Sequence, residues 1–291
     1  MLNTFRSCPR KAELQFIHHW HSSTPSIHLH AGSAFARGLE VARKAFFDEG
    51  APAEDAIAVG LRALVEAYGN VDCPPDHAKS LERVLGAFEY YFSVWPLESD
   101  PARPARLASG RHAIEFSFAI PLDIAHPETG DPILFAGRTD QIVQLENGLF
   151  VEDDKTASAL GASWARQWEL RSQFTAYAWA AQKSGLPVDG VLVRGIAIRK
   201  TGYDHAQAIT FRAPWEIDRW LRQTHRDVER WISLWRAGEY DYSLGEACLE
   251  YGGCMFSEIC KRSNPEEWLP AYFQKRIWDP LRRIETPGDP Q

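Results

Sequence analysis

Asp140, Asp153 and Lys155 are the residues whose types and spacing point most directly to chemistry. Two carboxylates supply the hard oxygen ligands that Mg²⁺ and Mn²⁺ prefer. A metal ion held there could bind a phosphate, lower the pKa of a bound water and stabilise a leaving oxygen. A lysine beside it could place or deprotonate that water. The three residues therefore predict metal-dependent hydrolysis of a phosphate ester.

A β-hairpin is the element that would bring these residues together. Two runs rich in Ile, Val, Leu and Phe flank Asn147-Gly148, which is a strong signal for a two-residue type I′ turn. With these as the two central turn residues, Asp140 faces Lys155 across the hairpin and Asp153 lies on the diagonal of the same face. Buried charges are costly unless they are paired or metal-bound, which favours a metal site. An Asp–Lys ion pair at the solvent end of a hairpin is the alternative.

The composition is that of a globular protein. Its 291 residues, 45% hydrophobic and 12% aromatic, can bury a large core in one elaborated domain or two joined ones. The formal net charge of −7 excludes a uniformly basic surface, but an enzyme that acts on nucleic acid needs only a local basic channel. The sequence has no run of 18 apolar residues and no secretory pattern at its start, so we expect a cytoplasmic protein with no membrane partner.

Hydrophobic periodicity predicts a mixed α/β fold around the hairpin. Gln173 and Tyr177 are spaced i, i+4 on a predicted helix and so share a face. Glu115, on the polar face of a predicted strand, is either an additional acid for the site or an exposed strand residue. The predicted helices are one after Cys8-Pro9, three within 34–95, and those at 163–184 and 214–237; the predicted strands besides the hairpin are 112–120, 188–200 and 206–212.

Five cysteines, an odd number with no export signal, indicate a metal or cluster site rather than disulfides. Cys248, Cys254 and Cys260 are separated by five residues each, and a tetrahedral or cubane centre needs a fourth ligand. Cys8 and Cys73 are the candidates, and we favour Cys8. Zinc bound by the same thiolates and unliganded buried cysteines are the alternatives to an iron–sulfur centre.

These motifs together resemble the PD-(D/E)XK nucleases of the RecB family. The resemblance covers most of the chain and is closest to the iron–sulfur branch, which includes the CRISPR-associated RecB-like exonucleases, the AddB nuclease domain and phage-encoded relatives. The family's "CPRK" motif is similar to Cys8-Pro9-Arg10-Lys11. Its "G-x-x-D … D-x-K-T" motif is similar to Gly137-Arg138-Thr139-Asp140 with Asp153-Asp154-Lys155-Thr156. Its "Q-x-x-x-Y" motif is similar to Gln173 through Tyr177.

The resemblance implies a fold and an order of regions along the chain. It implies an α/β restriction-endonuclease-like core, a mixed sheet flanked by helices, with an N-terminal helical insertion and an iron–sulfur closure of the two termini. The implied regions are 1–30 with the first cluster cysteine, 31–97 helical, 98–238 the nuclease core, and 239–291 the C-terminal cysteine cluster and tail.

The resemblance also implies an activity. We expect a metal-dependent DNA nuclease, an exonuclease that acts at single-stranded or free DNA ends. Its expected location is the cytoplasm of a bacterial or phage-infected cell. Its expected partner is a recombination, repair, replication or CRISPR-adaptation protein. The expected cofactors are Mg²⁺ or Mn²⁺ and a structural 4Fe–4S cluster, with Zn²⁺ as the alternative to the cluster. The residues expected to bind the metal ion are Asp140, Asp153, Glu40 and the carbonyl of Asp154, and Lys155 is expected to act in catalysis. The expected cluster ligands are Cys8, Cys248, Cys254 and Cys260. The expected DNA contacts are Gln173, Tyr177, Arg10 and Lys11, with further phosphate contacts by Arg6, Arg194, Arg199 and Lys200.

Two departures from the family pattern affect these expectations. Ala36 stands where family members often carry a metal-binding His; Glu40, one turn further along the same helical face, is the expected substitute, ahead of Glu115 and His30. The first two C-terminal cysteines are separated by five residues instead of two. A catalytically weakened module of the same fold that binds DNA or a partner, and an endonuclease, are therefore the alternative functions.

Overall fold

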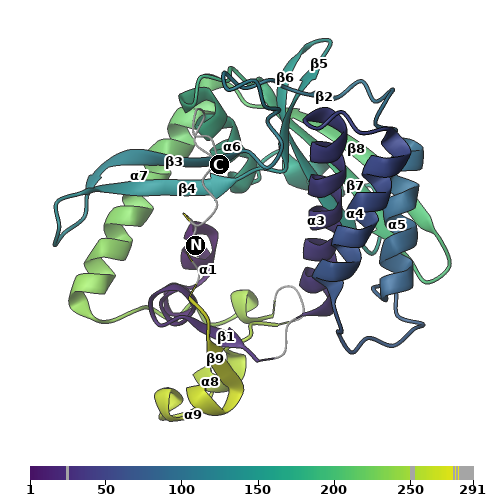
Figure 1. The fold of residues 1–291 in the computed structure, drawn as a ribbon. Helices are drawn as coiled ribbons and strands as arrows, with labels where there is room; N and C mark the ends of the chain where they lie inside the picture. The colour runs from purple at the N-terminus through teal and green to yellow at the C-terminus, as the bar shows by residue number, and fades with distance from the viewer. Residues whose placement is uncertain (24–25, 250–252, 278, 280, 282–291) are drawn as a thin grey trace. The chain divides into compact units, whose positions relative to one another are not determined.

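The computed structural model describes residues 1–23, 26–249, 253–277, 279 and 281, and Figure 1 shows its fold. The chain divides into two compact units. The first contains Met1–Pro25, Pro121–Phe135 and Asp218–Arg282, and the described residues of the second lie in Ser26–Ile120 and Ala136–Ile217. No helix in the described ranges is both long enough and apolar enough to cross a membrane.

A five-stranded mixed sheet forms the centre of the second unit. Its strand order is β2-β5-β6-β7-β8, with β6 and β7 parallel and the other neighbours antiparallel. All nine residues of β7 are buried, as expected for a central strand covered on both faces. The strands are β2 (Arg103–Pro104), β5 (Gln141–Leu145), β6 (Gly148–Ala157), β7 (Gly190–Ile198) and β8 (Tyr203–Phe211).

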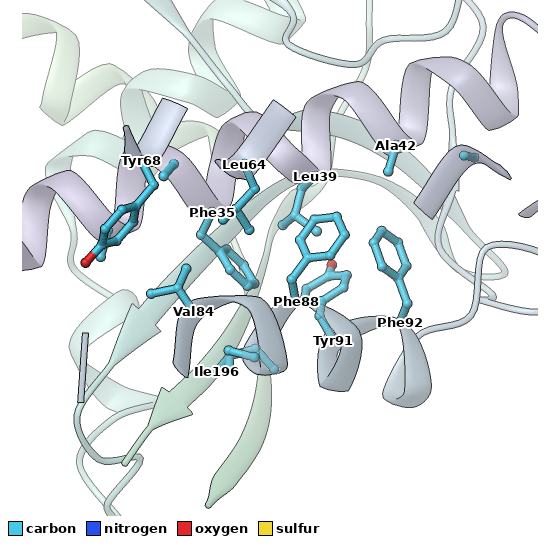
Figure 2. Close-up of a cluster of buried hydrophobic side chains, with 14 of the residues drawn as sticks. Phe35, Leu39, Ala42, Leu64, Tyr68, Val84, Phe88, Tyr91, Phe92 and Ile196 are labelled. Atoms are coloured by element: carbon cyan, nitrogen blue, oxygen red, sulfur yellow. The ribbon is translucent and has the colours of Figure 1, made fainter. Parts of the chain in front are cut away.

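The three helices predicted within 34–95 form as α3 (Ile27–Phe47), α4 (Ala53–Tyr68) and α5 (Leu81–Val94), and α4 packs on the other two. Figure 2 shows the apolar cluster that holds them, which contains Phe35, Leu39, Leu64 and Phe88 from the helices and Ile196 from β7. The cluster includes residues of β7 as well as residues of all three helices. Within it, α3 and α5 are the helices that pack directly against the sheet.

The central hairpin forms, but its predicted register is wrong. Leu145 pairs with Gly148, so Glu146 and Asn147 are the two turn residues. A type I′ turn needs positive φ at both central residues, whereas in this turn the positive φ of 143° belongs to Gly148. The pairing therefore shifts by two residues, which changes the cross-strand partners and keeps every side chain on its predicted face.

Two other predicted elements begin later along the chain than expected. The strand predicted over 112–120 begins only at Ser117 in β3 (Ser117–Ala125), because Glu115 has φ of 55° and interrupts the extended backbone. The helix predicted over 163–184 is α6 (Ser172–Lys183), preceded by one 3₁₀ turn at Arg166–Trp168.

The first unit is made of short elements around a small apolar core of Leu14, Phe256, Ile259, Leu269 and Phe273. Helix α7 has the predicted bounds, and the first helices begin at Leu2 and Pro9. Its elements are α1 (Leu2–Ser7), α2 (Pro9–Ala12), a π-helical turn (Glu13–Ile17), β1 (Trp20–Ser22) paired with β9 (Phe273–Lys275), the outer part of the hairpin β3 and β4 (Pro132–Arg138), most of α7 (Pro214–Ala237), a 3₁₀ turn (Glu246–Cys248), α8 (Ser257–Cys260) and α9 (Pro265–Tyr272).

Candidate active site

Asp153 and Lys155 share one face of β6, as the alternation of side chains requires. The Lys155 ammonium forms an ion pair with Asp153 Oδ1. The carboxylate of Asp153 is 4% exposed and the lysine side chain 33%, so the pair joins a buried anion to a cation that still reaches solvent.

Asp140 directly precedes β5 and joins this pair. Extending the observed register by one step places Asp140 opposite Asp153, not opposite Lys155 as predicted. Asp140 Oδ2 accepts a hydrogen bond of 2.7 Å from the backbone N–H of Asp154, and its carbonyl accepts one of 2.7 Å from Glu115. The predicted trio is therefore assembled, with its two carboxylates as the cross-strand neighbours.

The electrostatics of the trio are those of a site with excess negative charge. Burial raises the pKa of Asp140 to about 7, and the charges of Asp153 and Asp154 add to this. Burial also raises the pKa of Asp153, against the opposing effect of Lys155. Burial would lower the pKa of Lys155, but the charges of Asp153 and Asp140 outweigh it and raise that pKa. Two carboxylates thus share one lysine, an arrangement that favours binding of a further cation.

Glu115 and Glu40 extend the acidic group. Burial raises the pKa of Glu115 to about 8, and the charges of Asp140 and Glu40 contribute to this, although Arg138 Nε lies 2.5 Å from Glu115 Oε2. Glu115 is 7% exposed, so it is not the exposed strand residue of the alternative prediction. Its positive φ turns the side chain out of the regular strand pattern.

Glu40 lies on α3 and is 9% exposed. Its carboxylate is 2.7 Å from Arg37 Nη1 and 3.2 Å from Lys44 Nζ. Burial would raise the pKa of Glu40, but these two cations hold it below its usual value. Glu40 is therefore an ionised carboxylate near Glu115, as a metal ligand or its neighbour needs to be. His30 Nε2 instead donates a 2.7 Å hydrogen bond to the Tyr68 carbonyl.

Helix α6 covers the same face of the sheet. Gln173 Nε2 donates a 2.7 Å hydrogen bond to the hydroxyl of Tyr177, which confirms that the two side chains share a helix face. Burial raises the pKa of Tyr177, and the charges of Asp153 and Asp140 contribute, which places the phenol beside the acidic pair. The Lys155 ammonium also lies 6.0 Å from the centre of the Phe174 ring.

The sheet is closely covered beside Lys155. Gly195 of β7 pairs with Lys155, and a Cβ atom at Gly195 would lie 2.4 Å from the Trp164 ring. Trp164 and Trp168 are each 6% exposed, so they are core residues. These packed side chains leave little freedom for the strand that carries the lysine.

The opposite face of β6 carries a second set of charges. Asp154 Oδ2 accepts a 2.7 Å hydrogen bond from Arg43, and Asp154 Oδ1 accepts one of 2.8 Å from the Tyr91 hydroxyl. Glu152 Oε1 accepts hydrogen bonds from Arg43 at 2.8 Å and from Gln141 at 2.7 Å. The side-chain carboxylate of Asp154 is thus committed to this face, and metal binding by its carbonyl stays a prediction.

Arg194 belongs to the same buried set, and its predicted phosphate contact is wrong. It is 2% exposed and binds Asp100 through two hydrogen bonds of 2.5 and 2.7 Å. A buried, bidentately paired guanidinium is not available to a nucleic-acid strand. Its Nη1 also lies 3.5 Å from Glu152 Oε1.

The other predicted phosphate contacts are occupied by protein carboxylates to different degrees. Arg10 pairs with Glu13 at 2.5 Å and with Glu266, and Arg6 pairs with Asp227 at 2.7 Å. Arg199 and Lys200 form exposed pairs with Asp204 and Asp76, which compete little with a phosphate. DNA contacts by Arg10, Lys11, Arg6, Arg199 and Lys200 stay predictions.

The four predicted cluster cysteines line one small pocket of the first unit. Cys8, Cys248, Cys254 and Cys260 face it together with Arg10 and Lys11. Burial raises the pKa of Cys260 to about 11, and the thiols of Cys254, Cys8 and Cys248 contribute, so the four sulfurs are electrostatic neighbours. Cys73 is not among the pocket's lining residues.

The amino-acid sequence matches the model of one protein family over most of its length. The PD-(D/E)XK nuclease superfamily matches residues 1–261. The chain belongs to this superfamily. Membership implies a metal-dependent nuclease, a hydrolase of the phosphodiester bond that binds DNA, and the five-stranded mixed sheet flanked by helices is the expected type of fold.

Other comparisons contribute less. A comparison with curated proteins yields no match. A solved structure described as "Crystal structure of SSO0001" is 13% identical with a TM-score of 0.30, over 79% of this chain and 87% of that one. We draw nothing from a likeness at that level.

Nucleases of this superfamily usually use Mg²⁺ or Mn²⁺, and Asp140 with Asp153 fits such an ion. Burial raises the pKa of both carboxylates, and the charge of Lys155 opposes this rise without cancelling it. Within the described ranges, no three His, Cys, Asp or Glu side chains are arranged to hold a metal ion. Two carboxylates with water and substrate oxygens are nevertheless a common set for Mg²⁺.

Sequence reasoning missed Arg43, Glu152, Tyr91 and Gln141 as members of the site region. The available signal was the run Glu152-Asp153-Asp154-Lys155 inside a central strand. Such a run places acids on both faces of a buried strand, and each buried acid requires a partner. Gln141 is 11 residues from Glu152, but Arg43 and Tyr91 are 61 to 111 residues from the two acids, and no local pattern predicts them.

Proposed function

We propose that this protein is a Mg²⁺- or Mn²⁺-dependent DNA exonuclease that acts at single-stranded or free DNA ends. The observation that carries the proposal is the group formed by Asp140, Asp153 and Lys155, in which a half-buried and a buried carboxylate share one lysine. Superfamily membership supports the reaction class, and the RecB-like motifs of the sequence support the exonuclease assignment.

In the proposed reaction Asp140 and Asp153 hold the metal ion, with Glu40 as the third acid. The bound ion would supply positive charge to the scissile phosphate and lower the pKa of a water. Lys155, held by its ion pair with Asp153 and one-third exposed, would orient the attacking water. It also stabilises the negative charge that develops on the phosphate oxygens.

Gln173 and Tyr177 orient the strand in this proposal. Their hydrogen bond fixes both side chains on one face of α6, and the raised pKa keeps the phenol of Tyr177 protonated. A neutral hydroxyl beside two carboxylates can donate a hydrogen bond to a phosphate oxygen without adding negative charge.

Digestion of end-labelled linear single-stranded DNA with Mg²⁺ or Mn²⁺ tests the activity. Wild-type protein should degrade it, whereas Asp153→Ala and Lys155→Ala should not. The exposed residues Asp131 and Lys183 offer matched control substitutions, Asp131→Ala and Lys183→Ala, which should keep full activity. Degradation of covalently closed circular DNA would instead indicate an endonuclease.

Ala36, where relatives often carry a histidine, favours a second candidate function. In that case the protein is a catalytically weakened module that binds DNA or a partner. Wild-type protein that binds DNA but cleaves neither linear nor circular substrates with either metal ion would select this candidate over the nuclease.

We further propose that Cys8, Cys248, Cys254 and Cys260 hold a structural 4Fe–4S cluster, with Zn²⁺ as the alternative. The shared pocket of the four thiols supports a four-thiolate centre. The centre would join α2 to the segment around α8 and so stabilise a unit with a small apolar core.

Anaerobically purified protein should be brown, with broad absorbance near about 400 nm from thiolate-to-iron charge transfer. Cys8→Ser should lose this absorbance and Cys73→Ser should keep it, because Cys73 lies outside the pocket. A colourless preparation that contains zinc would contradict the iron–sulfur assignment.

A further inference from the structure

We propose that Arg43 is a positioning residue, which sets the geometry of the Asp140–Asp153 metal pair from the opposite face of the sheet. This proposal rests on the metal site proposed above. Arg43 lies on α3, and its side chain is only 5% exposed. It touches neither Asp140 nor Asp153, but it holds the residues on either side of Asp153.

The first connection runs through Asp154. Arg43 Nη1 donates to Asp154 Oδ2 at 2.7 Å, and the Tyr91 hydroxyl donates to Asp154 Oδ1 at 2.8 Å. With both oxygens held, the Asp154 side chain cannot rotate. The backbone N–H of the same residue donates to Asp140 Oδ2 at 2.7 Å. The guanidinium therefore determines where this N–H points and how the Asp140 carboxylate is oriented.

The second connection runs through Glu152. Arg43 Nη2 donates to Glu152 Oε1 at 2.8 Å, and Gln141 Nε2 donates to the same oxygen at 2.7 Å. Gln141 directly follows Asp140, and Glu152 directly precedes Asp153. The one oxygen of Glu152 thus links the backbone segments that carry both metal-binding carboxylates.

The third connection runs along α3. Glu40, the proposed third acid, precedes Arg43 by three residues and lies on a neighbouring part of the same helix surface. By binding β6, Arg43 fixes the helix that carries Glu40 relative to the strand that carries Asp153. All three proposed acids are therefore positioned by contacts that include one guanidinium.

Arginine is suited to this task and lysine is not. A guanidinium presents five donors in a rigid plane, and Arg43 uses it to bind Asp154, Glu152 and the Tyr91 hydroxyl together. A lysine keeps the positive charge but offers a single point of attachment. Arg43→Lys therefore separates the positioning role from simple charge balance.

Arg212 provides a matched control for a purely structural role. It is also a buried arginine, 5% exposed, and it donates to Thr175 Oγ1, to the Phe211 carbonyl and to the Trp168 carbonyl. These contacts stabilise the fold and include none of the residues next to Asp140 or Asp153.

The experiment measures Mn²⁺ affinity by calorimetry on protein dialysed free of divalent cations, and kcat and KM on single-stranded DNA. Arg43→Lys and Asp154→Asn should each weaken Mn²⁺ binding by about 10–100-fold, the usual effect of losing a residue that orients a metal ligand. They should lower kcat with little change in the KM for DNA. Arg212→Lys should lower the melting temperature while Mn²⁺ affinity stays at the wild-type value.

Tyr91→Phe keeps the ring and removes one donor to Asp154, so it remains informative if Arg43→Lys does not fold. It should weaken Mn²⁺ binding in the same direction by a smaller factor. Wild-type Mn²⁺ affinity in folded Arg43→Lys or Tyr91→Phe protein would overturn the positioning role alone. Wild-type protein that binds no Mn²⁺ would overturn the proposed metal site, and the positioning role with it.

Discussion

The two faces of β6 both carry carboxylates and cations, but they differ in how completely the carboxylates are paired. On the face toward α3 and α5, the acids Glu152 and Asp154 meet Arg43 and Arg194 through direct contacts. On the face toward α6, Asp140 and Asp153 share the single cation Lys155. Both sets are buried in one sheet, so burial alone does not distinguish them.

The difference lies in how many donors each carboxylate receives. Asp154 accepts two short hydrogen bonds through its side chain, whereas Asp153 has one ion pair and a raised pKa. Burial raises the pKa of Glu152 to about 7 as well, but the two arginines oppose this rise. A paired set stabilises the sheet, and an under-paired set costs stability while it prepares a place for a cation. The paired face is therefore expected to stabilise the fold, and the under-paired face is expected to carry out the reaction.

The largest expected effect comes from the under-paired face. Lys155→Ala should lower the rate of DNA cleavage by about 10²–10⁴-fold, the range for removing a group that moves or orients a proton in the transition state. The melting temperature should also fall, because the 4% exposed Asp153 carboxylate loses its ion pair, so cleavage is measured well below the variant's unfolding transition. Single-turnover cleavage and differential scanning calorimetry on the same preparation check both parts. A loss of activity that follows a loss of fold would contradict the assignment.

The next effect comes from the paired face. Arg43→Met should destabilise the protein by about 3–5 kcal/mol, because it leaves Glu152 and Asp154 buried without their guanidinium. Urea unfolding followed by circular dichroism gives this number. The exposed Arg199→Met, whose ion pair with Asp204 lies in solvent, should change stability by less than about 1 kcal/mol. Equal effects of the two substitutions would remove the distinction between the faces.

A smaller effect of opposite sign is expected on Asp140 and Asp153, the pair proposed to bind the metal ion. Asp140→Asn should raise the melting temperature by roughly 2–4 °C in EDTA at pH 8, because it removes a charge that burial and Asp153 disfavour. The same substitution should abolish the stabilisation by Mn²⁺. Asp131→Asn, on an exposed carboxylate, serves as the control. A lower melting temperature for Asp140→Asn would mean that this face is structural too.

The smallest effect concerns a lone charge at the end of β6. Lys79 is 2% exposed and donates to the Ala157 carbonyl at 3.4 Å, and burial lowers its pKa to about 8. Below pH 8 the folded protein holds a charged, buried ammonium, so Lys79→Met should be more stable than wild type by roughly 2 °C at pH 7.

This advantage has a defined dependence on pH. As pH rises from 8 towards 10.5, Lys79 is neutral in the folded protein but still protonated in the unfolded chain, so wild type gains stability and the difference shrinks. Melting curves of both proteins from pH 7 to pH 10 measure it. A difference that is independent of pH would show that Lys79 has the same pKa in the folded protein as in the unfolded chain.

The local parts of this fold could be predicted from the sequence. Helices α3, α4, α5 and α7 follow from apolar residues at helical spacing, and the hairpin follows from two apolar runs around a turn. The face shared by Asp140, Asp153 and Lys155 followed as well, because a two-residue error in register preserves the alternation of side chains. The grouping of Cys8 with three cysteines more than 230 residues later came from a family motif.

Tertiary structure decided which charges are paired. Whether Asp140 faces Asp153 or Lys155 depended on the φ angle of Gly148, and whether Glu115 lies in a strand depended on its own φ. Arg194 could be taken for a phosphate contact until the structure showed it bound to Asp100. Side-chain spacing along one segment is a local property, but the partner of a buried charge comes from a distant element. The sequence therefore determined which residues could act, and packing determined which of them remain free to do so.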